Sequence, residues 1–254
     1  LVEEEKKALS CKSFEIDTTA FDGPIPEPLK VAPKVEIADV AAFEAWKKSN
    51  VFQQKQAGYV AIGIKVLVGD FYTDKARLLA DLIKNYGANE LRFTLRQDIL
   101  IRNIKEDNLV FFYQELAKLD YVALGYNSTA DITACPGTDT CNLGIASSTG
   151  IATELERVLA AEYPQYNNNK DITIKISGCM NACGQHNMAQ IGFQGMSINS
   201  GKLVAPALQV LLGGGNLGNG NGRFADKVIK IPSRRGPEAL RFILNDFEAN
   251  ANGL

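Results

Sequence analysis

The stretch DITIKISGCMNACGQH, residues 171–186, runs directly from a predicted strand into two cysteines. DITIKIS has the length and composition of a β-strand. Cys179 and Cys183 follow at once in a short loop with a glycine beside each of them. The sequence therefore predicts a sheet that delivers a pair of thiols at the end of one of its strands.

A second pair of cysteines lies earlier, in TACPGTDTCNLG, residues 133–144. Cys135 and Cys141 flank a short loop of proline, glycine and hydroxylated residues. Four of the five cysteines of the chain thus fall into two tight pairs, which indicates one four-thiol site. The fifth, Cys11, lies in an irregular segment without a partner, and we expect it to be inert.

Three kinds of site could use four thiols. Disulfides are disfavoured, because an odd and small number of cysteines in a chain of 254 residues is typical of a reducing compartment. Structural zinc usually takes cysteines separated by about two to four residues, which CMNAC satisfies and CPGTDTC does not. Soft thiolates suit an iron–sulfur cubane, and Gly137, Gly178 and Gly184 would let backbone N–H groups approach its sulfides. The cluster is the favoured interpretation, and a zinc-stabilised interaction module stays as an alternative.

His186 is the only histidine of the chain and lies three residues after Cys183. It could complete a mixed metal site, but with four cysteines available we expect a polar loop residue. A nucleophilic role for Cys179 or Cys183 has no evident base other than this histidine.

Composition limits the other functions. With 46% apolar and 22% charged residues the chain can bury the core of one large domain or two small ones. A net charge of −2 argues against a nucleic-acid partner, although six basic residues face two acidic ones between Arg223 and Arg241. The longest apolar run is interrupted by Lys65 and is too short to cross a membrane. We expect a cytoplasmic protein. Because the chain begins at Leu1, we also expect it to be part of a longer polypeptide.

The first half of the chain predicts a lead-in, residues 1–49, and a small α+β module, residues 50–126. The lead-in ends in a helix with Asp39 as N-cap and Val40, Phe43 and Trp46 on one face. The module is a β-α-β-β-α unit with helices on one face of a mixed sheet. Its elements are a one-face-buried strand in GYVAIGIKVLVGD, a helix capped by Thr73 and ended by Gly87, strands in ELRFTL and DILIRNI, and a helix capped by Asp107.

Residues 127–254 predict a second, mixed α/β module that carries the cysteines. A helix is expected between Asn142 and Glu162, strands in AQIGFQGMSI and LVAPALQVLLGG, and a last helix opened by Gly236 and Pro237. The stretch GGGNLG, residues 213–218, has the spacing of a dinucleotide fingerprint, but no helical pattern follows it. We therefore interpret it as a loop.

The two cysteine motifs, C-x5-C in ACPGTDTCNLGIASS and C-x3-C in SGCMNACGQH, resemble the cluster motif of the sirohaem-dependent nitrite and sulfite reductases. The resemblance extends upstream through FQQKQAGYVAIGIKVLVGDF to the T-x-[NR]-Q segment at Thr94–Gln97, and downstream to IPSRRGPEALRFILNDF. It covers roughly residues 40–250. It implies a ferredoxin-like half-domain followed by a mixed α/β domain that binds an iron–sulfur cluster and sirohaem.

The resemblance also implies roles for single residues. Cys135, Cys141, Cys179 and Cys183 would hold a [4Fe-4S] cluster, and Cys183 would also ligate the sirohaem iron. Asn181 would lie against the macrocycle. Three further residues would contact the sirohaem carboxylates: Thr94, Arg96 and Gln97. The planar guanidinium of an arginine is well suited to binding a carboxylate. A solvated strand face is the alternative for Arg92 and Arg96.

Members of this family contain two copies of the half-domain, whereas this chain has one, which matches the second. The resemblance implies six-electron reduction of sulfite to sulfide or nitrite to ammonia, with ferredoxin or a flavoprotein as electron donor. The N-terminal half of the parent chain would supply most of the substrate pocket, so we expect this part to be inactive alone. Arg96 stands where the second copy of the half-domain commonly has Asn. This leaves open a homodimer in which the single half-domain of each chain takes the places of both copies. A small electron-transfer protein carrying only a cluster is a further alternative.

Overall fold

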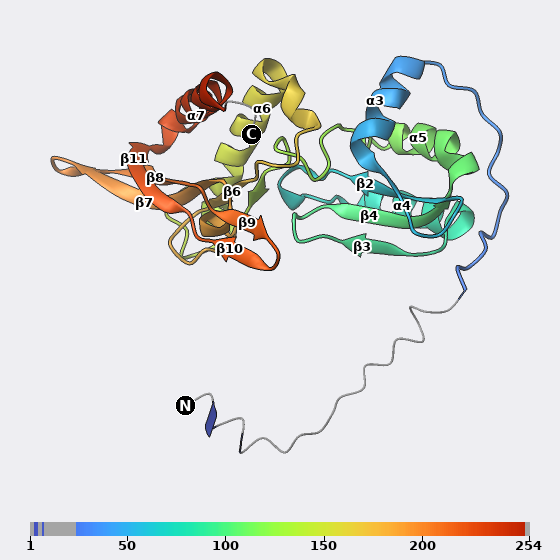
Figure 1. Cartoon of the computed structure of the whole chain (residues 1–254), viewed down its shortest axis with the longest axis horizontal. Helices are drawn as coiled ribbons and strands as arrows, with labels where there is room; N and C mark the ends of the chain where they lie inside the picture. Colours follow the sequence, from blue (N-terminus) through green and yellow to red (C-terminus); the bar gives the residue numbers. More distant parts are fainter. Residues whose placement is uncertain (1–2, 5–6, 8–23, 252–254) are drawn as a thin grey trace.

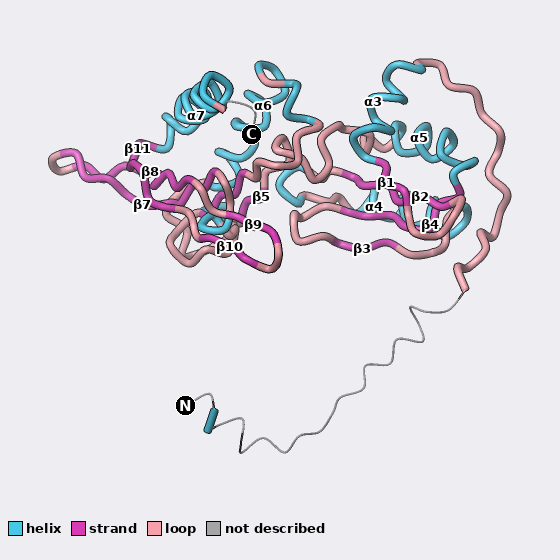
Figure 2. Tube along the Cα trace, in the orientation of Figure 1, coloured by secondary structure: helices cyan, strands magenta, loops and turns pink. Residues whose placement is uncertain are grey.

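The computed structural model describes residues 3–4, 7 and 24–251, and Cys11 lies outside the described residues. Two lobes stand side by side, each built on its own β-sheet (Figures 1 and 2). The first sheet has the order β1-β2-β4-β3 and the second β11-β8-β7-β6-β5. Among the described residues no helix is both long and apolar enough to span a membrane.

The first lobe packs its helices on a four-stranded antiparallel sheet. Trp46, Ile62 and Phe112 are among the largest fully buried side chains of its core. Its elements are α3 (Val40–Asn50), β1 (Val51–Gln53), β2 (Tyr59–Ile64), α4 (Thr73–Tyr86), β3 (Leu91–Phe93), β4 (Ile99–Lys105) and α5 (Leu109–Lys118).

The predicted N-cap of α3 is confirmed, whereas the predicted caps of α4 and α5 and the predicted type of sheet are wrong. Asp39 caps α3, since its Oδ1 accepts a hydrogen bond from the Ala42 amide at 2.9 Å. Thr73 is instead the first residue of α4, and Asp107 lies in a 3-10 turn before α5; neither helix has a side-chain cap. The sheet is antiparallel rather than mixed.

Strand β2 is shorter than predicted and buried on both faces. It ends at Ile64, because Val68 adopts a left-handed φ of 50° in the 3-10 turn that follows. A Cβ on Gly63 would come within 2.3 Å of the Tyr126 ring, so the second face is covered closely by the connection to the next lobe.

The second lobe contains a mixed five-stranded sheet. β5, β6 and β7 are parallel, whereas β8 and β11 continue the sheet antiparallel. Its core includes Leu155, Phe193 and Leu240, all fully buried. Its elements are β5 (Thr133–Ala134), α6 (Ser148–Glu162), β6 (Ile174–Ser177), β7 (Ile191–Ser200), β8 (Leu203–Leu212), β9 (Gly215–Gly218), β10 (Asn221–Arg223), β11 (Asp226–Pro232) and α7 (Gly236–Asn250).

The second lobe also departs from the prediction. Helix α6 begins at Ser148 rather than near Asn142, with the Ser147 hydroxyl as its cap. GGGNLG forms no helix: its last four residues are β9, which pairs with β10 as a hairpin. Strand β11 was not predicted.

Buried polar contacts join the lobes. Lys65 of the first lobe forms an ion pair of 2.6 Å with Glu156 of α6 and donates to the Ala130 carbonyl at 2.5 Å. The Gln97 side chain both donates to the Ala134 carbonyl, at 2.8 Å, and accepts from the Ala134 amide, at 3.0 Å. The β3–β4 turn is therefore fixed to the residue that immediately precedes Cys135.

Candidate metal centre

Two neighbouring parallel strands deliver the cysteine pairs. β5 and β6 pair with Ala134 opposite Ile176, and Cys135 and Cys179 follow these strands almost at once. Because parallel strands end at the same edge of a sheet, both cysteine loops begin at one edge. The cysteine pairs thus start from one edge, while a single four-thiol site stays a prediction.

The two loops are held together by backbone hydrogen bonds. The amides of Ile145 and Ala146, from the first loop, donate to the Gly178 carbonyl at 2.8 and 3.0 Å. In return, the Gly178 amide donates to the Cys135 sulfur at 3.1 Å. The loops therefore form one interlocked unit and not two separate turns.

Glycine is required where the loops touch. A Cβ on Gly178 would lie 2.7 Å from the Gly137 Cα, and one on Gly184 would lie 1.9 Å from the Ile176 carbonyl oxygen. These approaches are too close for any side chain, so both glycines have a packing reason. Gly137 also has a left-handed φ of 55°.

The four thiols are free and differ in exposure: Cys179 is buried, Cys135 is half-buried, and Cys141 and Cys183 are exposed. Apolar side chains of the same and adjacent loops are also exposed, which is unusual for a solvated loop and typical of a surface that another group covers. They are Leu143, Ile145, Met180 and Met188.

The described residues contain no group of three or more His, Cys, Asp or Glu side chains placed to hold a metal ion. A tetrahedral zinc site needs all its sulfurs about 2.3 Å from one ion. The donor set fits an anionic iron–sulfur cluster better, because a backbone N–H already points at one sulfur and the described hydrogen bonds bring no carboxylate to any of the four.

His186 is not the polar loop residue that the sequence predicted. It is 3% exposed, and its Nδ1 has no hydrogen-bond partner among the described residues. Burial lowers the pKa of His186, which keeps the imidazole neutral near neutral pH. It lies in the short 3-10 turn that closes the second cysteine loop.

The β3–β4 turn carries the three residues expected to contact sirohaem. Thr94 Oγ1 accepts from the amides of Arg96 and Asp98, both at 3.2 Å, so it shapes the turn. The Gln97 amide group is engaged with Ala134 on both its oxygen and its nitrogen. Arg96 Nη1 donates to the Ser128 carbonyl at 3.0 Å, and no hydrogen bond among the described residues uses the other N–H groups of the guanidinium.

Arg96 faces a cationic cavity that sequence reasoning did not find. The cavity measures about 660 Å³ and is also lined by Lys170 and Lys175. Lys175 lies on β6, and burial followed by the charge of Arg96 lowers its pKa. Its Nζ donates to Gln185 of the second cysteine loop at 2.5 Å. A lysine within a strand next to a cysteine loop was the available signal.

Three other residues singled out in the sequence differ in exposure. Asn181 is exposed between Cys179 and Cys183. Arg92 is exposed and paired with Glu90, which agrees with a solvated strand face for Arg92, whereas Arg96 is half-buried.

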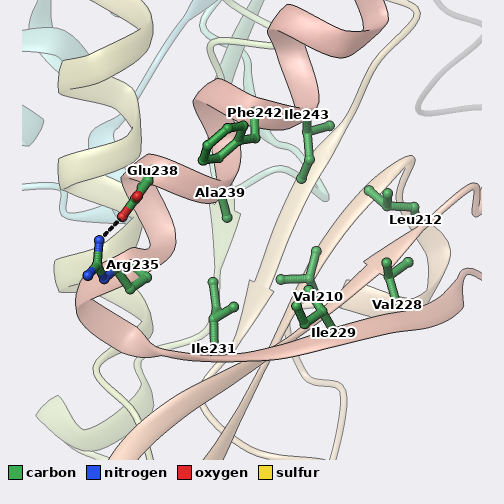
Figure 3. A pocket seen from close by; sticks show the side chains of 10 residues that line it. All are labelled: Val210, Leu212, Val228, Ile229, Ile231, Arg235, Glu238, Ala239, Phe242 and Ile243. Carbon is green, nitrogen blue, oxygen red and sulfur yellow. Dashed lines mark hydrogen bonds and ion pairs between the residues drawn. The ribbon is translucent and has the colours of Figure 1, made fainter.

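A separate apolar groove lies between α7 and the β8–β11 edge (Figure 3). Val210, Ile231 and Phe242 contribute to it, and Arg235 pairs with Glu238 at its rim. None of its lining residues belongs to the cysteine loops or to the first lobe.

Together the lobes define a class: a small α+β lobe with an antiparallel sheet, joined to a mixed α/β lobe that carries two cysteine loops at one sheet edge. Residues 52–119 match the nitrite/sulfite reductase ferredoxin-like half domain, and residues 125–252 match the nitrite and sulphite reductase 4Fe-4S domain. The chain belongs to the nitrite and sulfite reductase family. The predicted fold class is thereby confirmed, whereas the exact boundary near residue 126 stays a prediction.

Particular relatives are oxidoreductases with ferredoxin in their names. A ferredoxin–nitrite reductase from Synechococcus elongatus is 27% identical over 172 residues, which is 66% of this chain and 33% of the relative. A "Sulfite reductase [ferredoxin] 2" from Mycolicibacterium paratuberculosis is 30% identical over 207 residues, 80% of this chain and 34% of the relative. The chain thus spans about a third of the length of these curated relatives.

Solved structures agree. The Mycobacterium tuberculosis NirA protein superposes with a TM-score of 0.69 at 26% identity, covering 91% of this chain and 41% of NirA. A dissimilatory sulfite reductase superposes with a TM-score of 0.60 at 11% identity, which shows a shared fold only.

Proposed function

We propose that this chain is the cluster-bearing C-terminal part of a reductase that converts sulfite to sulfide or nitrite to ammonia with six electrons. The observation that carries the proposal is the pair of interlocked loops at the end of β5 and β6, which brings two cysteine pairs to one edge. Cys135, Cys141, Cys179 and Cys183 hold a [4Fe-4S] cluster, and Cys183 also ligates the sirohaem iron.

When bound, the cluster and sirohaem supply electrons and the iron atom at which the oxyanion is reduced. The residues of the chain position and shield these groups. Arg96 and Lys175 attract the sirohaem carboxylates into the cationic cavity, and Gln97 holds the β3–β4 turn against Cys135. Asn181, exposed between Cys179 and Cys183, would lie against the macrocycle.

The remaining partners follow from the family. The N-terminal half of the parent chain covers the exposed apolar side chains around the cysteines and supplies most of the basic substrate pocket. A ferredoxin or a flavoprotein provides the electrons. We expect residues 1–254 alone to reduce neither anion at an appreciable rate.

Anaerobic reconstitution with iron, sulfide and sirohaem tests this function. We expect the absorption bands of both cofactors, and about five irons per chain by metal analysis, roughly four in the cluster and one in sirohaem. Cluster bands without sirohaem would instead indicate an electron-transfer protein, and stoichiometric zinc without cluster bands would indicate a zinc module.

Single Cys→Ser variants test the ligand set. Replacement of any of the four paired cysteines should abolish stable incorporation of the cluster, while Cys11→Ser should leave it unchanged. A full cubane spectrum in two different paired-cysteine variants would contradict the assignment.

The cationic cavity is tested by Lys175→Gln, which should weaken sirohaem binding about tenfold because a charge-assisted hydrogen bond is lost. Lys202→Gln, at the exposed β7–β8 turn, is its control.

A further inference from the structure

Ser148 is a buried hydroxyl at the start of α6 that the proposed function does not use. Its side chain is fully buried, at 0% exposure. Its Oγ lies 2.6 Å from the Cys135 carbonyl oxygen and 3.5 Å from the Cys135 sulfur. It therefore contacts both the main chain and the thiol of one expected cluster ligand.

The hydroxyl has one hydrogen and two acceptors within reach. In the structure it donates to the Cys135 carbonyl, while either partner can supply the hydrogen between Oγ and the sulfur. A sulfur bound to iron carries no hydrogen and can only accept. The Ser148 hydrogen then lies between two acceptors of the same residue, and rotation about the Cβ–Oγ bond directs it to either.

Cys135 differs in this respect from the other three cysteines. Its sulfur also accepts the Gly178 amide at 3.1 Å. In the part of the chain that the structure describes, no hydrogen bond reaches the sulfur of Cys141, Cys179 or Cys183. Cys135 is thus the one ligand whose sulfur is oriented by the protein before any cluster binds.

Close packing fixes the position of the hydroxyl. A Cβ on Gly137 would lie 2.2 Å from Ser148 Oγ, and one on Gly178 would lie 3.2 Å from it. These glycines belong to the first and second cysteine loops. Ser148 therefore lies where α6 and both loops meet, and its hydroxyl has little room to move away from Cys135.

We propose that Ser148 is a positioning residue for the ligand Cys135, and that its hydroxyl donates to the ligated sulfur and thereby raises the reduction potential of the cluster. A hydrogen bond to a cluster sulfur stabilises the more negative, reduced state. The inference rests on the proposed function, since it needs a cluster at the four cysteines.

The test compares three variants of the reconstituted chain by anaerobic redox titration and by the rate of iron loss to a chelator. Ser148→Ala removes the hydroxyl and should lower the equilibrium constant for one-electron reduction about tenfold, which is about 59 mV. It should also release iron several-fold faster. Ser148→Thr keeps a hydroxyl and should restore both values toward those of the wild type.

Ser147→Ala is the matched control, because Ser147 is the exposed neighbour that caps the same helix. It should leave the potential unchanged even where it lowers the stability of α6. An unchanged potential in Ser148→Ala, or equal shifts in the Ala and Thr variants, would overturn the role of the hydroxyl. If Ser148→Ala holds no cluster, incorporation of the cluster by Ser148→Thr supports the positioning role. If neither variant incorporates a cluster, the role of the hydroxyl is contradicted. A wild-type chain that takes up no cluster would overturn the proposed function itself.

Discussion

Asp98 is a fully buried carboxyl at the junction of the two lobes, next to Gln97. Its Oδ1 accepts from the Val66 amide at 2.8 Å, which favours the charged form. Burial, and after it the charge of Asp131, act in the opposite direction and raise the pKa of Asp98 to about 9. The group is therefore protonated at neutral pH in the folded chain, whereas it ionises near its ordinary value of 3.8 when the chain unfolds.

This difference predicts a pH dependence of stability. Between the two pKa values the folded chain binds more protons than the unfolded chain, so the free energy of unfolding falls as pH rises from about 4 to about 9. Asp98→Asn keeps an acceptor for Val66 and cannot ionise. We expect it to match the wild type near pH 4.5 and to be more stable near pH 8.5, as measured by urea unfolding. Asp107→Asn, an exposed neighbour on the same lobe, should leave the slope unchanged.

At the scale of the residue, the sequence predicts which side chains are candidate ligands better than it predicts which residues contact one another. The four cysteines were found because their spacing is itself the signal. Ser148 and Lys175 were not found. A hydroxyl at the start of a helix has no pattern of its own, and the position of Lys175 in a strand next to a cysteine loop was a signal that the sequence reasoning did not use. Gln97 was assigned to a cofactor, whereas its amide also fastens Ala134 beside Cys135. Such a contact spans two lobes and depends on the folded structure.

The cysteine loops are the elements that we expect to depend most on the cofactor. Residues 134–147 and 178–188 contain little regular structure, whereas residues 50–125 form a lobe with its own core. We expect hydrogen exchange on the metal-free chain to show protection in the first lobe and little in the loops, and reconstitution to protect the loops. Equal protection of the loops in both forms would contradict organisation by a cluster.

The close contact at Gly184 provides a sharper test at this scale. In Gly184→Ala the new Cβ would meet the Ile176 carbonyl oxygen at 1.9 Å, and a backbone atom cannot turn aside as a side chain can. The second cysteine loop must then shift, and we expect the iron content after reconstitution to fall severalfold. Gly222→Ala is the control, because its nearest atom would be 3.6 Å away. Equal iron content in the two variants would show that the contact is not required.

Elements were predictable where one face is buried and the other is not. Strand β4, whose burial largely alternates, and helix α3 follow from alternation and from helical spacing. Strands β7 and β8 were predicted although their burial does not alternate, since the first five residues of β7 are all buried. Strand β11 was missed because nearly all its residues are exposed, so it has no buried face to pattern it, and only pairing with β8 makes it a strand. The start of α6 was misplaced because residues 142–147 are held in the cysteine loop by Gly178 instead of continuing the helix.

At the scale of the whole molecule, the edge of the first sheet is exposed and carries large apolar side chains. β3 is an edge strand of the first sheet, and Phe93 on it and Leu95 just after it are 75% and 87% exposed. An exposed edge strand with apolar side chains favours pairing with another chain, and the proposed N-terminal half is the partner that we expect to cover it.

This surface leads to a prediction about assembly. We expect the N-terminal half of the parent chain, supplied in trans, to bind residues 1–254, to strengthen their retention of sirohaem and to restore dye-linked sulfite or nitrite reduction. Phe93→Asp should weaken this association about tenfold or more, because burial of an aromatic side chain contributes about 1.5–3 kcal/mol and a buried charge opposes it. Leu203→Asp, at the equally exposed β7–β8 turn, should not weaken it. If residues 1–254 alone turn over either anion robustly, or associate as a dimer through the β3 edge, the edge serves a complete small enzyme and the two-part assembly is wrong.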